Sequence, residues 1–304
     1  MLPVPPVSPH RRSLLLAAAA APWLGACTTA APIADAAPLA RARAALARLE
    51  AAADGRLGVC AFGASGGPVL RHRAEERFPA CSTFKVLAAA AVLARSVVVP
   101  GLMERQVRYG REDLVPYSPV TERRAGEGMT CAALCAAALR YSDNTAGNLL
   151  LREIGGPPGL TAYARSIGDA AFRLDRWETA LNDAAPGDPR DTCTPQGMAR
   201  SLRRLLLGDA LPPPQRAQLA DWMRGNTTGD ARIRAGVPAG WTVADKTGSG
   251  DYGTANDIGV AWPVSGAPLV IAVYFTQDRQ PPAGAPYRSE VIAEAARIAV
   301  RALA

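Results

Sequence analysis

The distribution of strand-like and helix-like patterns along the chain is the feature that most constrains its fold. Apolar stretches typical of strands occur near both ends, at residues 57–62, 68–73, 254–262 and 269–276. From residue 82 to residue 221 the patterns are almost all helical, at 82–96, 130–141, 144–154, 159–167, 194–207 and 213–224. Two further amphipathic helices are predicted, one near each end, at 38–53 and 289–302.

This order predicts a two-domain α/β (α+β) fold. One domain, residues 38–80 and 222–304, is an antiparallel sheet with flanking helices, built from both termini. The other, residues 81–221, is an inserted all-α domain. It includes residues 173–192, which are too polar and too often interrupted by proline and glycine to form one helix. A loop this long in a compact domain is usually functional.

The first 27 residues are typical of an export signal. Two arginines, Arg11 and Arg12, precede an apolar run at 14–24 that is too short to span a membrane. The paired arginines resemble a twin-arginine signal, and Leu-Gly-Ala-Cys ending at Cys27 resembles a bacterial lipobox, whose cysteine is lipidated and becomes the new N-terminus.

An ordinary signal cleaved near Ala37 is the alternative, because Ala-x-Ala sites also occur between residues 31 and 37. In both cases we predict an exported, periplasmic protein. With cleavage at Cys27, residues 28–37 would form an alanine-rich tether and Cys27 would carry a lipid anchor.

The composition argues against several classes of function. The only histidines are His10, inside the signal, and His72, so a Ser-His-Asp hydrolase would depend on His72 and a zinc hydrolase would lack imidazoles. Removal of residues 1–27, which contain two arginines and no acidic residue, lowers the net charge from +7 to +5. No basic run with interleaved aromatic residues is present, so nucleic-acid binding is not expected.

Five cysteines follow Cys27, at Cys60, Cys81, Cys131, Cys135 and Cys193. Their odd number and the absence of C-x-x-C spacing predict at least one free thiol and no metal site. Cys131 and Cys135 lie four residues apart in a predicted helix, so their Cβ atoms would be about 5–6 Å apart. A disulfide typically joins Cβ atoms about 3.8 Å apart, so these two should not pair. Most of the cysteines are expected to be buried as small apolar residues.

The two lysines single out a candidate site. Of 34 basic residues only Lys85 and Lys246 are lysine. Lysine can lose its proton when it is buried near other cations and can then act as a base, whereas arginine cannot. Lys85 follows Ser82 by three residues, and an amine on the same helix face as a hydroxyl can make serine nucleophilic. We expect burial near Lys246 to make Lys85 easier to deprotonate.

Two other motifs have the right chemistry for such a site. Lys246 opens the sequence K-T-G-S-G beside a predicted strand, and its ammonium with the hydroxyls of Thr247 and Ser249 would bind a carboxylate. Between the lysines, Ser142 and Asn144 belong to Y-S-D-N at the junction of two predicted helices. Taken alone, S-D-N is better explained as a helix N-cap.

Together, S-T-F-K at 82–85, S-D-N at 142–144 and K-T-G at 246–248 resemble the motif set of the penicillin-recognising serine enzymes. The resemblance covers the chain after about residue 38. Within that family, Glu178 to Asn182 resemble the E-x-x-L-N loop of class A β-lactamases, which disfavours a D-alanyl-D-alanine peptidase. A β-lactam sensor that stays acylated is the alternative outside the enzymes, and it would normally need a transmembrane segment or a second domain.

The resemblance implies an active site between the two domains and a role for each catalytic residue. Ser82 would attack the lactam carbonyl, and either Lys85 or, through water, Glu178 would take its proton; the choice stays open. Ser142 would pass a proton to the leaving nitrogen. Glu178 would then direct water onto the acyl-enzyme, because an acyl-serine ester is stable without such a base.

The resemblance also implies the binding residues Asn144, Asn182, Lys246, Thr247, Ser249, Tyr117 and Arg232. Arg234 and Arg288 are weaker alternatives to Arg232 as the arginine behind the carboxylate pocket. The oxyanion would lie between the backbone N–H groups of Ser82 and Ser249. The implied protein is a monomeric antibiotic-resistance enzyme that acts on small β-lactams without metal or cofactor.

Several positions depart from common family patterns. Thr179 replaces a frequent proline next to Glu178, and Ala89 replaces a cysteine that would pair with Cys135. Carbapenem-hydrolysing members often link a cysteine at position 81 to one at position 250, where this chain has Gly250. The resemblance therefore leaves carbapenem hydrolysis open. An ion pair that fastens the family's loop would correspond to Arg176 and Asp191.

Overall fold

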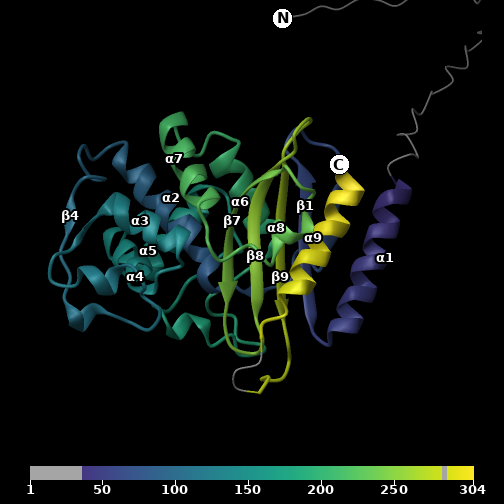
Figure 1. The fold of residues 1–304 in the computed structure, drawn as a ribbon, viewed down its shortest axis with the longest axis horizontal. Helices are drawn as coiled ribbons and strands as arrows, with labels where there is room; N and C mark the ends of the chain where they lie inside the picture. Colours follow the sequence, from purple (N-terminus) through teal and green to yellow (C-terminus); the bar gives the residue numbers. More distant parts are fainter. Residues whose placement is uncertain (1–35, 283–285) are drawn as a thin grey trace, which may run out of the picture. The chain divides into compact units, whose positions relative to one another are not determined.

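A five-stranded antiparallel sheet joins the two ends of the described chain (Figure 1). The computed structural model describes residues 36–282 and 286–304. The strands are β1 (Arg56–Gly63), β2 (Val69–His72), β7 (Thr242–Ser249), β8 (Ala255–Trp262) and β9 (Leu269–Thr276), in the order β2-β1-β9-β8-β7. β1 pairs with β9 along its whole length, from Arg56 opposite Thr276 to Gly63 opposite Leu269. The predicted sheet built from both termini is confirmed.

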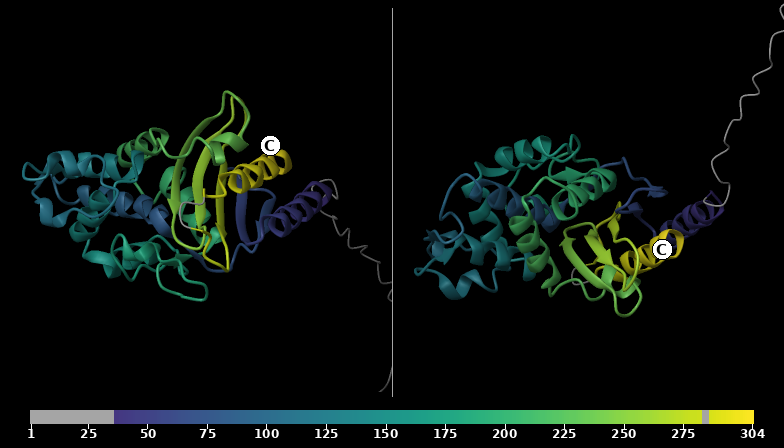
Figure 2. Two further views of the ribbon diagram at one scale, coloured as in Figure 1. Left: turned by 60° about the horizontal axis from the view of Figure 1, so that its bottom comes forward. Right: turned by 90° about the horizontal axis from the view of Figure 1, so that it is seen from above.

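Both faces of this sheet are covered by helices (Figures 1 and 2). On one face α1 (Ala36–Ala53) and α9 (Ser289–Leu303) pack against each other, and on the other α6 (Pro195–Leu206) contacts β1, β8 and β9. Alternate residues of β1 enter different cores, with Val59 facing α1 and α9 and Cys60 facing α6. The strands therefore read as nearly continuous apolar runs, although antiparallel sheets often have one polar face.

The middle of the chain forms the helical part beyond α6. Its helices are α2 (Phe84–Ser96), α3 (Cys131–Arg140), α4 (Asn144–Glu153), α5 (Gly156–Ser166) and α7 (Pro213–Arg224). α2 is buried from Phe84 to Leu93 and contacts α3, α4, α5 and α7, so it is the central helix of this part. A helix that is apolar on all sides is expected in such a position.

Short elements that the sequence did not predict complete the fold. They are the strands β3 (Phe78–Pro79), β4 (Gln106–Val107), β5 (Met129–Thr130) and β6 (Thr192–Cys193), the short helix α8 (Ile233–Gly236), and the 3₁₀ helices η2 (Cys81–Thr83), η3 (Arg111–Asp113), η4 (Thr121–Arg124) and η5 (Ala180–Asn182). β3 pairs with β6 and β4 with β5. The segment predicted to be all-α therefore contains short strands. They were missed because two residues are too few to show the alternating pattern of a strand.

The N-terminal predictions are only partly covered by the described residues. Ala36 and Ala37, predicted as the end of the tether, belong to α1, so that part of the prediction is wrong. Residues 28–35, the export signal and Cys27 lie outside the described residues. None of the described helices has the length and hydrophobicity that a membrane span needs. The domain boundaries near residues 80 and 221 stay predictions.

Candidate active site

Ser82 and Lys85 lie where the chain turns from η2 into α2. Cys81 has a φ of +44°, a left-handed conformation that aims the following residue at the boundary between the sheet and the helical part. The Lys85 Nζ donates to Ser82 Oγ at 2.8 Å. Lys85 is fully buried, and Ser82 keeps 8% of its surface exposed. The Ser82 hydroxyl is thus accessible to solvent, whereas the Lys85 amine bonded to it is not.

Lys85 has three further partners around its ammonium. It donates to the Ser142 carbonyl oxygen at 2.9 Å and to Asn144 Oδ1 at 2.6 Å. Its Nζ also lies 2.9 Å from Glu178 Oε1. The sequence did not predict this contact, which brings the carboxylate of the long loop directly against the amine.

Lys246 lies within β7, the strand at one edge of the sheet. Its Nζ donates to Ser142 Oγ at 3.0 Å and to the Thr247 carbonyl oxygen at 2.8 Å. Burial, followed by the Lys85 charge, holds the pKa of Lys246 well below the usual lysine value, and Asp245 and Asp257 oppose the shift. Ser142, at a φ of +58°, thus has its hydroxyl on Lys246 and its carbonyl on Lys85.

Glu178 approaches the same point from the long loop. Its Oε1 accepts from Ser82 Oγ at 3.4 Å, and its Oε2 accepts from Asn182 Nδ2 at 2.6 Å. The Glu178–Thr179 peptide bond is cis. Glu178 itself is 5% exposed, so its carboxylate is directed at the serine and not at bulk solvent.

Asn148 holds the backbone of Glu178 and was missed in the sequence. Its Oδ1 accepts from the Glu178 N–H at 2.9 Å, and its Nδ2 donates to the Glu178 carbonyl oxygen at 3.1 Å. Asn148 lies four residues after Asn144 on α4, and positions i and i+4 share a helix face. That spacing was the one available sign that both asparagines serve the same site.

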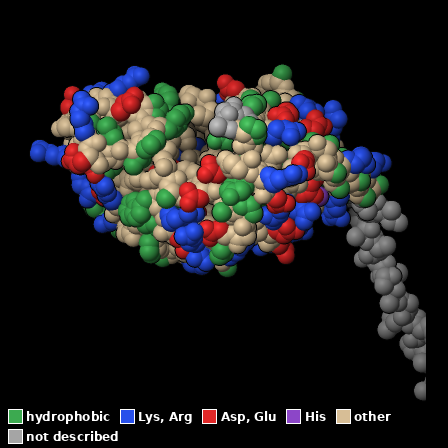
Figure 3. Space-filling view, turned by 90° about the horizontal axis from the view of Figure 1, so that it is seen from below, with side chains coloured by type: hydrophobic (Ala, Val, Ile, Leu, Met, Phe, Trp, Pro, Cys, Tyr) green, Lys and Arg blue, Asp and Glu red, His purple; other side chains and the backbone are tan. Residues whose placement is uncertain are grey.

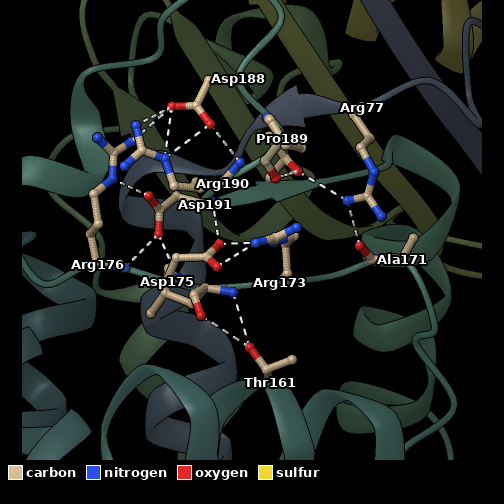
Figure 4. Close-up of polar contacts among 12 residues, drawn as sticks. Arg77, Thr161, Ala171, Arg173, Asp175, Arg176, Asp188, Pro189, Arg190 and Asp191 are labelled. Atoms are coloured by element: carbon tan, nitrogen blue, oxygen red, sulfur yellow. Dashed lines mark hydrogen bonds and ion pairs between the residues drawn. The ribbon is translucent and has the colours of Figure 1, made fainter.

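Arg176 and Asp191 fasten the two ends of the loop together (Figure 4). The Arg176 Nε lies 2.5 Å from Asp191 Oδ2, the contact that the family resemblance implied. The other oxygen of Asp191 accepts from the backbone N–H groups of Asp175 at 2.7 Å and Arg176 at 2.9 Å. Asp191 is 1% exposed, so this is a buried anchor for the loop.

Two further ion pairs lie on the outer side of the loop (Figure 4). Arg173 lies 2.5 Å from Asp175, and its hydrogen bonds lower the pKa of that carboxyl. Arg190 lies 2.7 Å from Asp188 and lowers the pKa of Asp188 to about 2. Charge pairs therefore hold the segments on both sides of Glu178.

Arg232 is the arginine of the three candidates that reaches the site. Its guanidinium donates to Ser249 Oγ and to the carbonyl oxygens of Gly248 and Asn256, each at 2.7 Å. Burial lowers the pKa of Arg232. Arg234 binds Asp245 instead, with its Nε 2.7 Å from Oδ1, and the Arg288 Nε lies 2.5 Å from Glu290 Oε1.

A cavity of about 380 Å³ collects these side chains. It is lined by Ser82, Tyr117, Ser142, Asn144, Asn182, Thr228, Arg232, Thr247, Gly248, Ser249 and Tyr287. Eight of these eleven were predicted, and Lys85, Lys246 and Glu178 are buried behind the wall. Thr228 was missed, and its hydroxyl lies 2.5 Å from that of Thr247. Tyr287 was also missed; its ring centroid is 6.0 Å from the Arg232 guanidinium carbon.

The remaining chemical candidates lie away from this cavity. The His72 Nε2 contacts Glu50 Oε2 at 3.0 Å, and His72 does not line the cavity. Within residues 36–282 and 286–304, no three His, Cys, Asp or Glu side chains are grouped to hold a metal ion. The five cysteines in this part of the chain are all free and buried, as predicted for Cys131 and Cys135.

Comparison with known proteins places the chain in one family. A model described as the β-lactamase enzyme family matches residues 39–303. The carbapenem-hydrolysing β-lactamase KPC of Klebsiella oxytoca is 51% identical over 298 residues, 98% of either chain. The structure of a β-lactamase from Burkholderia phymatum superposes with a TM-score of 0.85 at 52% identity, covering 88% of this chain and 100% of that one.

A variant of the reconstructed last common ancestor of Gram-negative class A β-lactamases is 56% identical, with a TM-score of 0.82. The match covers 86% of this chain and 98% of the ancestral one. These matches extend over nearly all of the described residues and include the whole cavity. The chain belongs to the class A serine β-lactamases.

Proposed function

We propose that the protein hydrolyses the β-lactam amide of penicillins and cephalosporins, with Ser82 as nucleophile and Glu178 as the base of the second step. The position of Glu178 carries this proposal. One of its oxygens is 3.4 Å from Ser82 Oγ and the other 2.6 Å from Asn182 Nδ2. A carboxylate held beside the nucleophile can activate water against an ester formed there.

Substrate binding uses the β7 side of the cavity. The hydroxyls of Thr247 and Ser249 receive the substrate carboxylate, and Lys246 and Arg232 supply positive charge behind them. Tyr117, 61% exposed at the rim, forms the opposite wall. The lactam carbonyl then lies over Ser82, with its oxygen between the backbone N–H groups of Ser82 and Ser249.

In the acylation step the Ser82 oxygen bonds to the lactam carbon and the C–N bond of the lactam breaks. The serine proton passes through water to Glu178, or to Lys85 after Lys85 has given one of its own protons to Glu178, 2.9 Å away; in either route Glu178 gains one proton. The departing nitrogen takes a proton from Ser142, whose hydroxyl accepts a hydrogen bond from Lys246. Lys246 supplies the replacement proton, and its lowered pKa makes that transfer easier. Before deacylation the proton taken from Ser82 passes through water in the cavity to Lys246, which leaves Glu178 ionised and Lys246 charged again.

In the deacylation step Glu178 takes a proton from a water molecule between its carboxylate and Asn182. The hydroxide oxygen attacks the ester carbon, and Ser82 leaves with a proton returned from Glu178. The buried Oδ1 of Asn182 has no partner among the described residues, which supports a role in binding this water.

We also propose that the protein is an exported, periplasmic monomer, anchored by a lipid on Cys27. The sequence before residue 28 supports this, since a twin-arginine-like pair and a lipobox-like motif occur in order. Intact-mass measurement of the protein from a bacterial membrane fraction tests the anchor. A mass that fits acylated residues 27–304 supports it, and an unmodified chain beginning near Ala37 contradicts it.

Carbapenem hydrolysis is a separate question of substrate range. The relative KPC is named for this activity, but here Gly250 replaces the cysteine that carbapenem-hydrolysing members often place opposite Cys81. A direct assay with a carbapenem decides the point.

The decisive experiment is intact-protein mass during turnover of a penicillin, on the wild type and on Glu178→Ala. We expect the wild type to turn over without a lasting adduct and the variant to accumulate one on Ser82. Gln196→Ala is a surface control that should behave as the wild type. A wild type that holds the adduct for hours contradicts the proposal and points to a peptidase or a sensor.

A further inference from the structure

The outward side of α1 has an unusual composition. Its inward side packs Ala42, Leu46 and Ala53 into the core against α9 and the sheet. Its outward side consists of small apolar residues, at Ala40, Ala44, Ala47 and Ala51. These alanines are three or four residues apart and so form one stripe along the helix.

Arginines border this stripe on both sides. Arg41 and Arg48 are seven residues apart and lie on one flank, and Arg43 lies on the other. All three are exposed, and within the described residues none has an ion-pair or side-chain hydrogen-bond partner. The single acidic residue of α1, Glu50, is half-buried. Its Oε1 lies 2.7 Å from Arg73 Nε and its Oε2 lies 3.0 Å from His72 Nε2. The exposed face of α1 therefore carries three arginines, and the one carboxylate of the helix is engaged by other residues.

The position of this face leaves the active site uncovered. α1 contacts β2, at one edge of the sheet, whereas Lys246, Thr247 and Ser249 belong to β7 at the opposite edge. Figure 1 shows α1 at the end of the described chain away from α3, α4 and α5, and Figure 3 shows basic side chains at that end. A flat surface bound to α1 would not obstruct the cavity.

We propose that this face of α1, Arg41, Arg43 and Arg48 with the alanines between them, docks on an anionic phospholipid surface. The proposal rests in part on the lipid anchor at Cys27 proposed above. Eight residues separate Cys27 from Ala36, and such a link spans at most about 30 Å. An anchored chain thus keeps α1 within reach of the lipid headgroups.

The charge and shape of the face fit that partner. Basic residues next to an anionic leaflet are worth about 1 kcal/mol each, about fivefold in partitioning. Three arginines therefore amount to about a hundredfold, and the effect weakens with salt. Short alanine side chains let the helix approach the headgroups closely. A lipid chain together with a basic patch is a two-signal attachment, which holds more firmly than either alone.

The test uses the mature chain without its lipid, residues 28–304, which contains the whole compact unit from Ala34 to Ala304. Co-sedimentation is measured with phosphatidylcholine vesicles, with and without phosphatidylglycerol. The variant replaces Arg41, Arg43 and Arg48 by glutamine. The matched control replaces Arg108, Arg111 and Arg123, which are also exposed, have no described partner and belong to the segment around β4 at the other end.

We expect the α1 variant to lose about a hundredfold in binding to the anionic vesicles and the control to lose little. The proposal is overturned if the control loses as much, if neutral vesicles bind the wild type equally, or if no vesicle binds it. Penicillin hydrolysis, measured on the same preparations, keeps this result separate from the proposed function. A variant that hydrolyses normally but binds anionic vesicles like the wild type overturns the docking proposal alone.

Discussion

The amide of Asn148 brackets the backbone of Glu178, accepting from its N–H at 2.9 Å and donating to its carbonyl at 3.1 Å. The proposed base is thus positioned by a rigid helix, although it belongs to a loop. A residue that acts in this way should matter for every step in which Glu178 is the base. That includes deacylation in the proposed mechanism, and also acylation if the serine proton passes through water to Glu178.

Replacement of Asn148 by alanine should therefore slow deacylation. Two hydrogen bonds worth about 1 kcal/mol each are lost, so we expect kcat to fall about tenfold to thirtyfold. Rapid-mixing kinetics with a penicillin should show a burst, followed by slow turnover. An unchanged rate of deacylation would contradict the positioning role. Thr161→Ala, which removes a hydrogen bond to the loop at Leu174, is the control and should leave deacylation nearly unchanged.

Replacement of Arg232 by lysine should weaken substrate binding. The guanidinium donates to three acceptors, including Ser249 Oγ, and a lysine cannot reproduce that planar arrangement. Loss of one hydrogen bond from a charged group should raise KM about tenfold or more, with a smaller change in kcat. Arg234→Lys, which alters the neighbouring arginine on Asp245, should leave KM nearly unchanged.

Replacement of Gly250 by cysteine should create a disulfide with Cys81. An ideal Cβ at position 250 lies 2.7 Å from Cys81 Sγ, close to the distance between these two atoms in a disulfide. The same Cβ lies 2.7 Å from the Asn182 carbonyl oxygen, which must shift slightly. Mass spectrometry of the oxidised variant should show the loss of two hydrogens. The double variant with Cys81→Ser should keep its full mass, and an unchanged mass in the single variant would refute the prediction.

Acid should weaken the loop through its aspartates. The pKa of Asp188 is lowered to about 2 by Arg190, and that of Asp175 is lowered by Arg173. Because these pKa values are lower in the folded protein than in the unfolded chain, the unfolded chain takes up protons at a higher pH than the folded protein does. The ion pairs therefore stabilise the folded protein fully above about pH 3.9, and this contribution is lost as the pH falls toward 2.

Urea unfolding at about pH 5 and about pH 3 checks this acid effect. The drop in midpoint between the two pH values should be smaller for Asp188→Asn than for the wild type. Asp209→Asn, an exposed aspartate without a described partner, should show the wild-type drop. Equal drops in all three proteins would exclude the Asp188 pair as a source of acid sensitivity.

The sequence predicted the features that depend on local spacing. Ser82 and Lys85 share one turn, so their contact follows from helix geometry. Four of the five strands of the sheet were located by their apolar stretches, whereas β7, which contains Lys246, was not predicted as a strand. Glu178 was identified by its resemblance to a family loop, because a glutamate in a polar loop has no local mark of burial.

The missed residues depend on contacts between distant segments. Thr228 reaches Thr247 from the segment after α7, and Tyr287 reaches Arg232 from the segment before α9. Neither belongs to a motif, so no spacing in the sequence marks it. The carboxylate on Lys85 was missed for the same reason, since it comes from a loop almost a hundred residues away.

The pairing of β1 with β9 also has a consequence for how the chain folds. Arg56 faces Thr276, so the central ladder of the sheet joins segments that are made at the beginning and the end of synthesis. Such contacts close a very long loop and raise the contact order, which slows folding. Until β9 has been made, β1 has only β2 as a partner and its other edge is open. A nascent chain therefore exposes an aggregation-prone strand edge until residues 269–276 emerge, and premature termination before them should yield insoluble protein.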